Sequence, residues 1–200
     1  MVLTVDGKDY SGSFTMSIPK YAAKVIEEGT EVEKALAKDV LAYVQAAYNY
    51  FADYNTEEEI ERVNAIVDKL LALGGDYVGE PTTSGTTAKD NSGIVTDITL
   101  NLDSKPTIRF YVTDTNVSFY LDGKKLNTVS GVDEKYGAYV ELDVYAYALA
   151  ETITYGNGGS YHISDFLTKS AGTPHENIVA CFIKYVESAA AYRTSVLESS

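Results

Sequence analysis

The chain has 200 residues, of which 45% are hydrophobic and 22% charged, and its formal net charge is -13. This composition is typical of a folded protein with one or two cores and excludes a wholly disordered chain. The acidic balance argues against nucleic acid or an anionic membrane surface as a partner. No apolar run approaches the roughly 20 residues that a membrane span needs. A single cysteine excludes an internal disulfide, and with only two histidines it leaves little for a zinc site.

Two helices are predicted in the first half of the chain by their start and stop signals. Residues 30–33 (Thr-Glu-Val-Glu) have the pattern of a capping box, and apolar residues follow at helical spacing, which predicts a helix over 31–53. A second capping box at 56–59 begins another helix, and the glycines at 74–75 end it. Because the connection between the two helices is short, we expect an antiparallel helical hairpin.

The clearest domain boundary is at residues 79–93, a stretch rich in Gly, Thr, Ser and Asp. Such a composition is typical of a linker or a mobile loop. We therefore expect residues 1–78 to form a partial unit, a β-hairpin plus the helical hairpin. Residues 94–200 are expected to form a second unit.

The second unit begins with strands. From residue 94 the apolar period changes to two, which predicts about six short strands before residue 162. Asp122-Gly123 is a strong hairpin signal. The expected fold class is α+β: a small antiparallel β-sandwich of immunoglobulin-like size, packed with a helical hairpin or bundle.

The chain ends with a further predicted helix. Residues 173–176 (Thr-Pro-His-Glu) have the pattern of a third capping box, with proline at the first helical position. The apolar stripe that follows predicts a helix over 174–196. Cys181 is expected as a small buried thiol within that stripe, and His175 is expected to be exposed to solvent.

A partial internal repeat relates the two ends of the chain. Residues 16–21 parallel residues 161–166, and residues 43–50 parallel residues 185–192. The repeated unit has the order strand, turn, strand, short helical turn, long helix, and the sandwich strands precede only its second copy. Two interpretations stay open: either the chain was cut from a longer one, or residue 1 is a natural start whose hairpin joins a single sandwich.

These repeated residues carry a resemblance. A tyrosine-rich β segment, a short Y-x-(I/V)-x-x-(Y/F) element and a helix with Y-x-x-x-A-x-x-Y resemble modules of large secreted or surface-attached proteins of Gram-positive anaerobes. The resemblance implies an extracellular location, a place in a longer multi-domain chain and no defined activity, and it supplies no catalytic residue. The first copy departs from the pattern by having Pro19-Lys20 where the second has Ser164-Asp165. The matching residues are Tyr161, Ile163, Phe166, Tyr185, Ala189 and Tyr192, with Met16, Ile18, Tyr21, Tyr43, Ala47 and Tyr50 in the first copy.

Motifs that carry chemistry are missing from the sequence. It has no nucleophile elbow, phosphate loop or dinucleotide glycine motif. Ser160, His162 and Asp165 are close in sequence, but the first copy of the repeat has Ser17 at the position of His162. Residues 114–116 (Asp-Thr-Asn) could offer one or two oxygens to calcium, although such residues more often shape a turn. We predict no catalytic residue, cofactor or resident metal.

Tyrosine is the unusual feature of the composition, with 17 tyrosines and no tryptophan. On the alternating strands one set of side chains should fill the core and the other set should form an outer face that could bind a sugar or a protein. Three structural roles for the tyrosines compete with binding: tyrosine is a favourable strand residue, the helices could cover this face, and the helical tyrosines recur at packing positions. The candidate binding residues are Arg109, Tyr111, Tyr120 and Tyr139, on the assumption that Ile108, Phe110, Phe119 and Val140 point into the core.

Three functions are weighed on these observations. The leading hypothesis is a non-catalytic extracellular or cell-surface module with a spacer or adhesion-type role. The alternative is a carbohydrate- or peptide-binding module that uses the outward tyrosine face. An enzyme with a diffuse acidic site has no support in the sequence. The expected partners are a glycan or another surface protein, with no nucleic acid and no insertion into a membrane.

Overall fold

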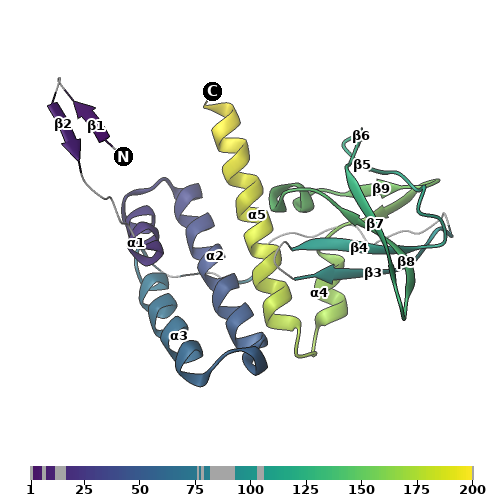
Figure 1. Ribbon diagram of the computed structural model, residues 1–200, viewed down its shortest axis with the longest axis horizontal. Coiled ribbons are helices and arrows are strands. Elements are labelled where there is room, and N and C mark those ends of the chain that lie inside the picture. Colours follow the sequence, from purple (N-terminus) through teal and green to yellow (C-terminus); the bar gives the residue numbers. More distant parts are fainter. Residues whose placement is uncertain are drawn as a thin grey trace.

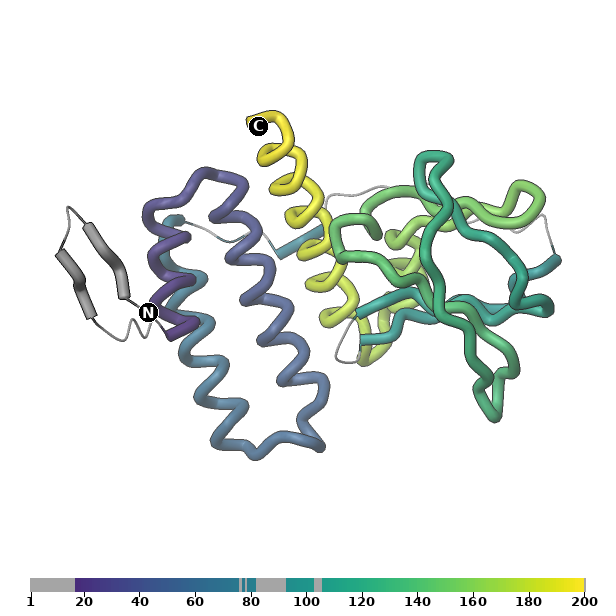
Figure 2. Tube along the Cα trace, turned by 45° about the horizontal axis from the view of Figure 1, so that its top comes forward, coloured from purple at the N-terminus to yellow at the C-terminus, as the bar shows by residue number. Residues whose placement is uncertain are grey.

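The protein is α+β, as predicted, and a single long helix stands between its helical half and its β half (Figure 1). Helices α1–α3 lie on one side of α5 (Glu176–Glu198), and the strands of the two larger sheets lie on the other side (Figure 2). The computed structural model describes the backbone of residues 2–5 and 8–11, and all of residues 17–75, 77, 79–81, 93–102 and 106–199.

The helical half contains the two helices predicted from their capping boxes. In α2 (Glu31–Tyr50) the Thr30 hydroxyl accepts from the Glu33 N–H, and a Glu33 carboxylate oxygen accepts from the Thr30 N–H at 2.8 Å. The same reciprocal pair begins α3 (Glu57–Leu71) at Thr56. Helix α2 ends three residues before the predicted boundary because a 3-10 turn, η1 (Ala52–Tyr54), follows Phe51. The repeat's short helical turn is an 11-residue helix here, α1 (Ile18–Glu28).

A small apolar core holds these three helices together. Ile26 of α1 is fully buried, and it belongs to one cluster with Leu41 of α2 and with Val67 and Leu70 of α3. Strands β1 (Val2–Val5) and β2 (Lys8–Ser11) pair with each other as a two-stranded sheet of their own.

The β half contains two four-stranded antiparallel sheets. One has the order β3-β4-β8-β7, made of β3 (Val95–Asn101), β4 (Thr107–Val112), β7 (Thr128–Asp133) and β8 (Gly137–Leu142). The other has the order β10-β9-β5-β6, made of β5 (Phe119–Leu121), β6 (Lys124–Lys125), β9 (Ile153–Tyr155) and β10 (Gly159–Tyr161). In the described residues after position 93 there are thus eight strands where about six were expected, because several are only two or three residues long.

The turn predicted at Asp122-Gly123 is confirmed. Leu121 pairs with Lys124, so the loop has two residues, and Asp122 and Gly123 have φ values of 48° and 74°. Positive φ at both central residues is the signature of the tight turn that matches the twist of a hairpin.

One large apolar cluster joins both sheets to the helices that follow them. It includes Phe110 of β4, Phe119 of β5, Tyr155 of β9, Tyr161 of β10 and Phe182 of α5. The assumption about the inward face is confirmed: Ile108, Phe110, Phe119 and Val140 are all fully buried.

The predicted start of the last helix is wrong. Helix α5 begins at Glu176, and His175 before it makes no side-chain cap. The groups expected to form a capping box hold the preceding turn instead. The Gly172 N–H donates to the Glu176 carboxylate at 2.8 Å, and the His175 N–H donates to the Thr173 hydroxyl at 3.2 Å.

Helix α5 is buried on two sides, which explains its central position. Its residues Val179, Phe182, Ile183 and Val186 belong to the core of the β half. On the other side, Ile178 and Cys181 pack with Ala42 and Ala46 of α2, so Cys181 is buried as predicted. The rings of Tyr43 and Tyr185 stack in this seam between α2 and α5, with centroids 6.0 Å apart and planes 13° from parallel.

One sequence prediction falls mainly outside this description, and another is tested only within it. Most of the proposed linker at 79–93, residues 82–92, lies outside the described residues, so the boundary stays a prediction. No helix in the described part of the chain has both the length and the apolar character to cross a bilayer.

Candidate functional site

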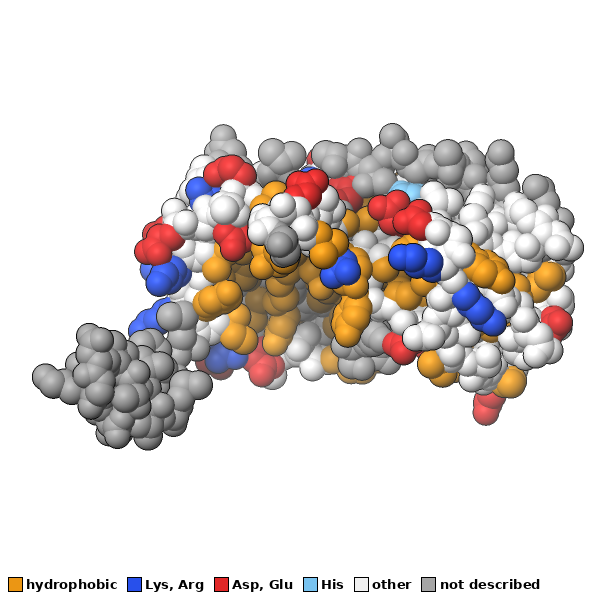
Figure 3. All heavy atoms as spheres, turned by 90° about the horizontal axis from the view of Figure 1, so that it is seen from above, with side chains coloured by type: hydrophobic (Ala, Val, Ile, Leu, Met, Phe, Trp, Pro, Cys, Tyr) orange, Lys and Arg blue, Asp and Glu red, His pale blue; other side chains and the backbone are white. Residues whose placement is uncertain are grey.

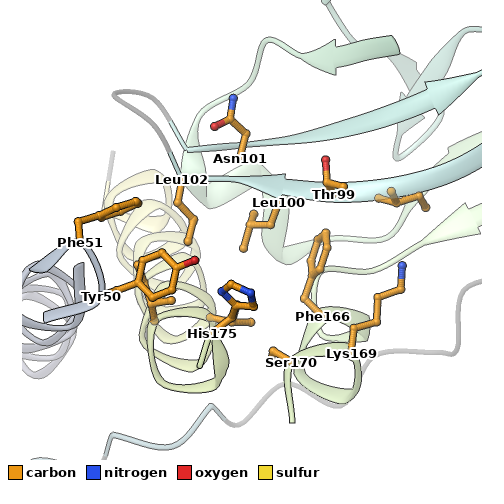
Figure 4. A pocket seen from close by; sticks show the side chains of 13 residues that line it. Tyr50, Phe51, Thr99, Leu100, Asn101, Leu102, Phe166, Lys169, Ser170 and His175 are labelled. Carbon is orange, nitrogen blue, oxygen red and sulfur yellow. The ribbon is translucent and has the colours of Figure 1, made fainter. Parts of the chain in front are cut away.

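A hollow lies where the helical half meets the β half. It has a volume of about 420 Å³ and lies between the end of α2, strand β3, the short helix α4 (Asp165–Ser170) and the start of α5 (Figure 4). We call it the junction groove. Its most prominent lining residues are Tyr50, Phe51, Leu100, Leu102, Phe166 and His175.

Each wall of the junction groove is positioned by the end of an element. Helix α2 stops at Tyr50, so the rings of Tyr50 and Phe51 meet edge to face at the helix end, with centroids 4.8 Å apart. On the opposite wall, Phe166 of α4 is fixed by an edge contact with Tyr161, at 5.4 Å between centroids. Leu100 of β3 and Leu102, just after this strand, point into the hollow (Figure 4). The result is a largely aromatic and aliphatic surface.

A few polar groups converge on this surface. The His175 ring lies 5.3 Å from the Tyr50 ring, between centroids, at the middle of the groove (Figure 4). The Lys169 ammonium lies 5.9 Å from the Phe166 ring centroid and 4.0 Å from a carboxylate oxygen of Asp97. Among the residues that the structure describes, no Asp or Glu lines the groove, although the chain has 29 acidic residues. An apolar hollow with a few convergent polar groups is the usual form of a ligand site.

The only sequence cluster that resembled a catalytic group has a structural role. The His162 side chain is buried, and its ring nitrogens lie 2.8 Å from the Ser164 hydroxyl and 2.9 Å from the Ala150 carbonyl oxygen. The backbone N–H of His162 donates to the Asp165 carboxylate, 3.3 Å away. These contacts tie the turn after β10 to η2 (Ala146–Ala150). Both ring nitrogens are therefore occupied by partners that hold the turn.

The structure also tests the calcium candidate at residues 114–116. The Asp114 carboxylate accepts from the backbone N–H and from the side-chain amide of Asn116, both at 2.9 Å. This is the turn-shaping role that such residues usually have. Across the described ranges, no three or more His, Cys, Asp or Glu side chains gather as metal ligands would.

Three of the four candidate residues from the sequence come together on the sheet. Arg109 of β4 donates through Nε to Glu141 of β8 at 2.7 Å, and its guanidinium carbon lies 4.0 Å above the Tyr139 ring centroid. The Tyr139 ring in turn covers Gly131 of β7, where a Cβ atom would overlap it. Burial acts to lower the pKa of Arg109, but its hydrogen bonds to Tyr111 and Glu141 outweigh burial and raise it.

The tyrosines do not form one platform. Tyr111 is only 4% exposed, because the rings of Tyr136 and Tyr139 lie against it at 5.3 and 6.2 Å between centroids. Tyr120 is 37% exposed, but it belongs to β5 in the other sheet. Arg109, Tyr111 and Tyr139 thus make one packed network, and Tyr120 stands apart from it.

A second polar cluster, in the seam between α2 and α5, has no precedent in the sequence analysis. Asp39 is 2% exposed there, and burial raises its pKa to about 6, although a hydrogen bond to Ser188 and the Lys184 ammonium act to lower it. The neighbouring Lys38 ammonium donates to the Gly75 carbonyl oxygen at 2.7 Å. This cluster holds α2, α5 and the chain after α3 together.

The junction groove was also missed by sequence reasoning, apart from the exposure of His175. The available signal was the pair of aromatic residues Tyr50-Phe51 at the end of a predicted amphipathic helix, where an apolar stripe continues past the helix itself.

Comparisons of this chain with protein-family models, with curated proteins and with solved structures find no match.

Proposed function

We propose that this chain is a non-catalytic extracellular module with an adhesion-type role, and that the junction groove is its contact site. One observation carries the proposal: the groove is aromatic and aliphatic, and no described Asp or Glu lines it in a chain of net charge -13. Such a surface is suited to recognition, because apolar burial supplies affinity and a few polar groups fix orientation. The extracellular location is supported by the resemblance to surface-protein modules.

The proposal includes the finer architecture. We infer that the two larger sheets form a small sandwich and that hairpin, short helix and long helix are a repeated unit within a longer multi-domain chain. The element order supports the repeat, since two strands followed by two helices occur twice, as β1, β2, α1, α2 and as β9, β10, α4, α5. The stacking of Tyr43 on Tyr185 adds support, because these two residues occupy equivalent positions in the two copies.

A binding screen with paired variants tests the function. The intact protein is applied to arrays of glycans, cell-wall polysaccharides and peptides, and Tyr50→Ala is compared with Tyr145→Ala. Tyr50 lines the groove, whereas Tyr145 is an exposed tyrosine outside it. We expect saturable binding that Tyr50→Ala weakens by about tenfold or more, the usual loss when a central aromatic contact is removed. Turnover of esterase, glycosidase or peptidase substrates, abolished by one point mutation, would contradict the proposal.

The outward tyrosine face is the second candidate, again for a carbohydrate or a peptide. It is supported by the exposed rings of Tyr120 and Tyr136 and by the Arg109–Tyr139 stack. Tyr120→Ala and Tyr139→Ala are the informative variants, because Tyr111 is packed beneath its neighbours. Binding that is lost in these variants and kept in Tyr50→Ala would move the site from the groove to the sheet.

A further inference from the structure

Strand β3 is the outermost strand of its sheet and has an open edge. Among the described residues its only neighbour is β4. Beside this pair, the Thr113 N–H, just after β4, donates to the Ile94 carbonyl oxygen, just before β3, at 2.8 Å. The register shifts between Val95 and Asp97, and regular pairing then continues to Asn101. Because backbone groups of successive residues alternate between the two sides of an antiparallel strand, those of Ile98 and Leu100 face away from β4.

One hydrogen bond supports this assignment. The Ile98 N–H donates to the carboxylate of its own neighbour Asp97 at 2.8 Å, which places this N–H on the side away from β4. Asp97 and the register shift thus protect the first half of the edge in the way that natural sheets protect exposed edges. At the Ile98 carbonyl oxygen and at Leu100, in the second half of the edge, the described residues supply no such device.

The junction groove runs along this second half of the edge. Five consecutive residues, 98–102, line it. Successive side chains of a strand point to opposite faces of the sheet, so a hollow lined by all five wraps around the strand's edge. Figure 4 shows β3 along one side of the hollow, with Phe166 and Lys169 of α4 across from it.

We propose that the junction groove binds an extended peptide segment of a partner protein, which adds a strand to the open edge of β3. This inference rests on the proposed function and names its partner class. The Leu100 N–H and C=O supply pairing groups that only a backbone in extended conformation satisfies in register. An apolar side chain of the added strand fills the space between Tyr50, Phe166 and His175. The Lys169 ammonium favours an acidic residue of the added strand beside it, in competition with Asp97, whose carboxylate oxygen lies 4.0 Å from the ammonium.

Backbone methylation of a peptide tests strand addition directly. The probe is a synthetic library of capped octapeptides that alternate Thr with Val, Ile, Phe or Tyr and carry one Glu, and binding to the full chain is measured by fluorescence anisotropy. The tightest peptide is then made in two N-methylated forms, with the methyl groups on alternate residues. One form blocks the hydrogen bonds to β3 and should bind about tenfold or more weakly, whereas the other should change by less than about threefold.

Proline variants make the matching test on the protein. Leu100→Pro removes the outward N–H and leaves the ladder to β4 intact, since proline is tolerated where the N–H of an edge strand faces solvent. Val132→Pro is the control, at an exposed position on the other edge strand of the same sheet, β7. Only Leu100→Pro should lose peptide binding. If it does not fold, Lys169→Glu with the exposed control Lys125→Glu takes its place, and only Lys169→Glu should weaken binding.

The outcomes separate this inference from the function on which it rests. If no library peptide binds with a dissociation constant below about 1 mM, strand addition is wrong. Equal loss with both N-methylated forms would also overturn it. If a glycan binds and Tyr50→Ala loses that binding, the groove remains the functional site, but its ligand is the glycan and not a peptide. If no array ligand and no peptide binds, the proposed function fails as well.

Discussion

The two helical pairs of this chain, α1–α2 and α4–α5, which the proposed repeat aligns with each other, have opposite surroundings. Ile18 at the start of α1 is 81% exposed, whereas Ile163 just before α4 is fully buried. Tyr21 is 61% exposed, whereas Phe166 at the matching position is 6% exposed. The difference comes from the β sheets, which cover the second pair and leave the first without a cover. The same local motif is thus core in one place and surface in the other.

The uncovered pair presents a second apolar hollow. Its volume is about 320 Å³, and it is lined by Tyr21 and Val25 of α1, Leu36 and Val40 of α2, and Tyr192 of α5. Figure 3 shows hydrophobic side chains gathered over the helical half of the molecule. An amphipathic pattern identifies which side chains form the apolar face of a helix. Whether this face is buried depends on a second element that packs against it.

The largest expected effect on stability comes from replacing equivalent isoleucines of the two pairs by alanine. Ile163→Ala removes a fully buried side chain from the large core and should lower the free energy of unfolding by about 2–5 kcal/mol. Ile18→Ala removes an exposed one and should change it by less than about 0.5 kcal/mol. Urea unfolding of both variants checks the difference. A large loss in Ile18→Ala would show that α1 is covered in solution and would remove the contrast.

The next effect concerns the helix seam, where the proposed repeat equates Asp39 of α2 with Cys181 of α5. Burial raises the pKa of Asp39 from 3.8 to about 6 and that of Cys181 to about 11, so only Asp39 titrates near neutral pH. The folded protein holds the Asp39 proton more tightly than the unfolded chain. This contribution is fully present below pH 3.8 and is lost as the pH rises through about 6, for a total of about 3 kcal/mol.

Urea unfolding between pH 3.5 and pH 8 measures that contribution. Stability should fall as the pH rises through about 6, and Asp39→Asn should flatten this part of the profile because the amide has no proton to lose. The other groups around Asp39 are Lys184, Glu187, Tyr77 and Ser188, and they stay unchanged in the variant. An unaltered pH profile in Asp39→Asn would assign the titration to another group.

The predictable parts of this fold are those set by neighbours in sequence. Two of the three predicted capping boxes, at the starts of α2 and α3, form as expected, and the Asp122-Gly123 turn forms because its backbone requirement is local. The inward set of strand residues is also correct, since alternation alone separates the two faces of a strand.

The candidate site was beyond sequence reasoning because its walls come from three stretches that are distant in the sequence. The junction groove needs the end of α2, the edge of β3, α4 and the start of α5 to meet, and no local pattern reports that meeting. The same holds for Arg109, whose partner Glu141 is defined by the register between β4 and β8. Tyr111 shows the limit of alternation, because rings from other positions of its sheet bury a residue on the outer face.

The smallest expected effect compares how the two long helices begin. Helix α2 has a full capping box, so Thr30→Ala should cost about 1 kcal/mol of stability. Helix α5 begins after His175, whose side chain caps nothing, so His175→Ala should change stability by less than about 0.5 kcal/mol. Thermal and urea unfolding of both variants provide the measurement. If His175→Ala costs as much as Thr30→Ala, the imidazole holds the start of α5. If it costs nothing but weakens binding in the junction groove, His175 is retained there for recognition.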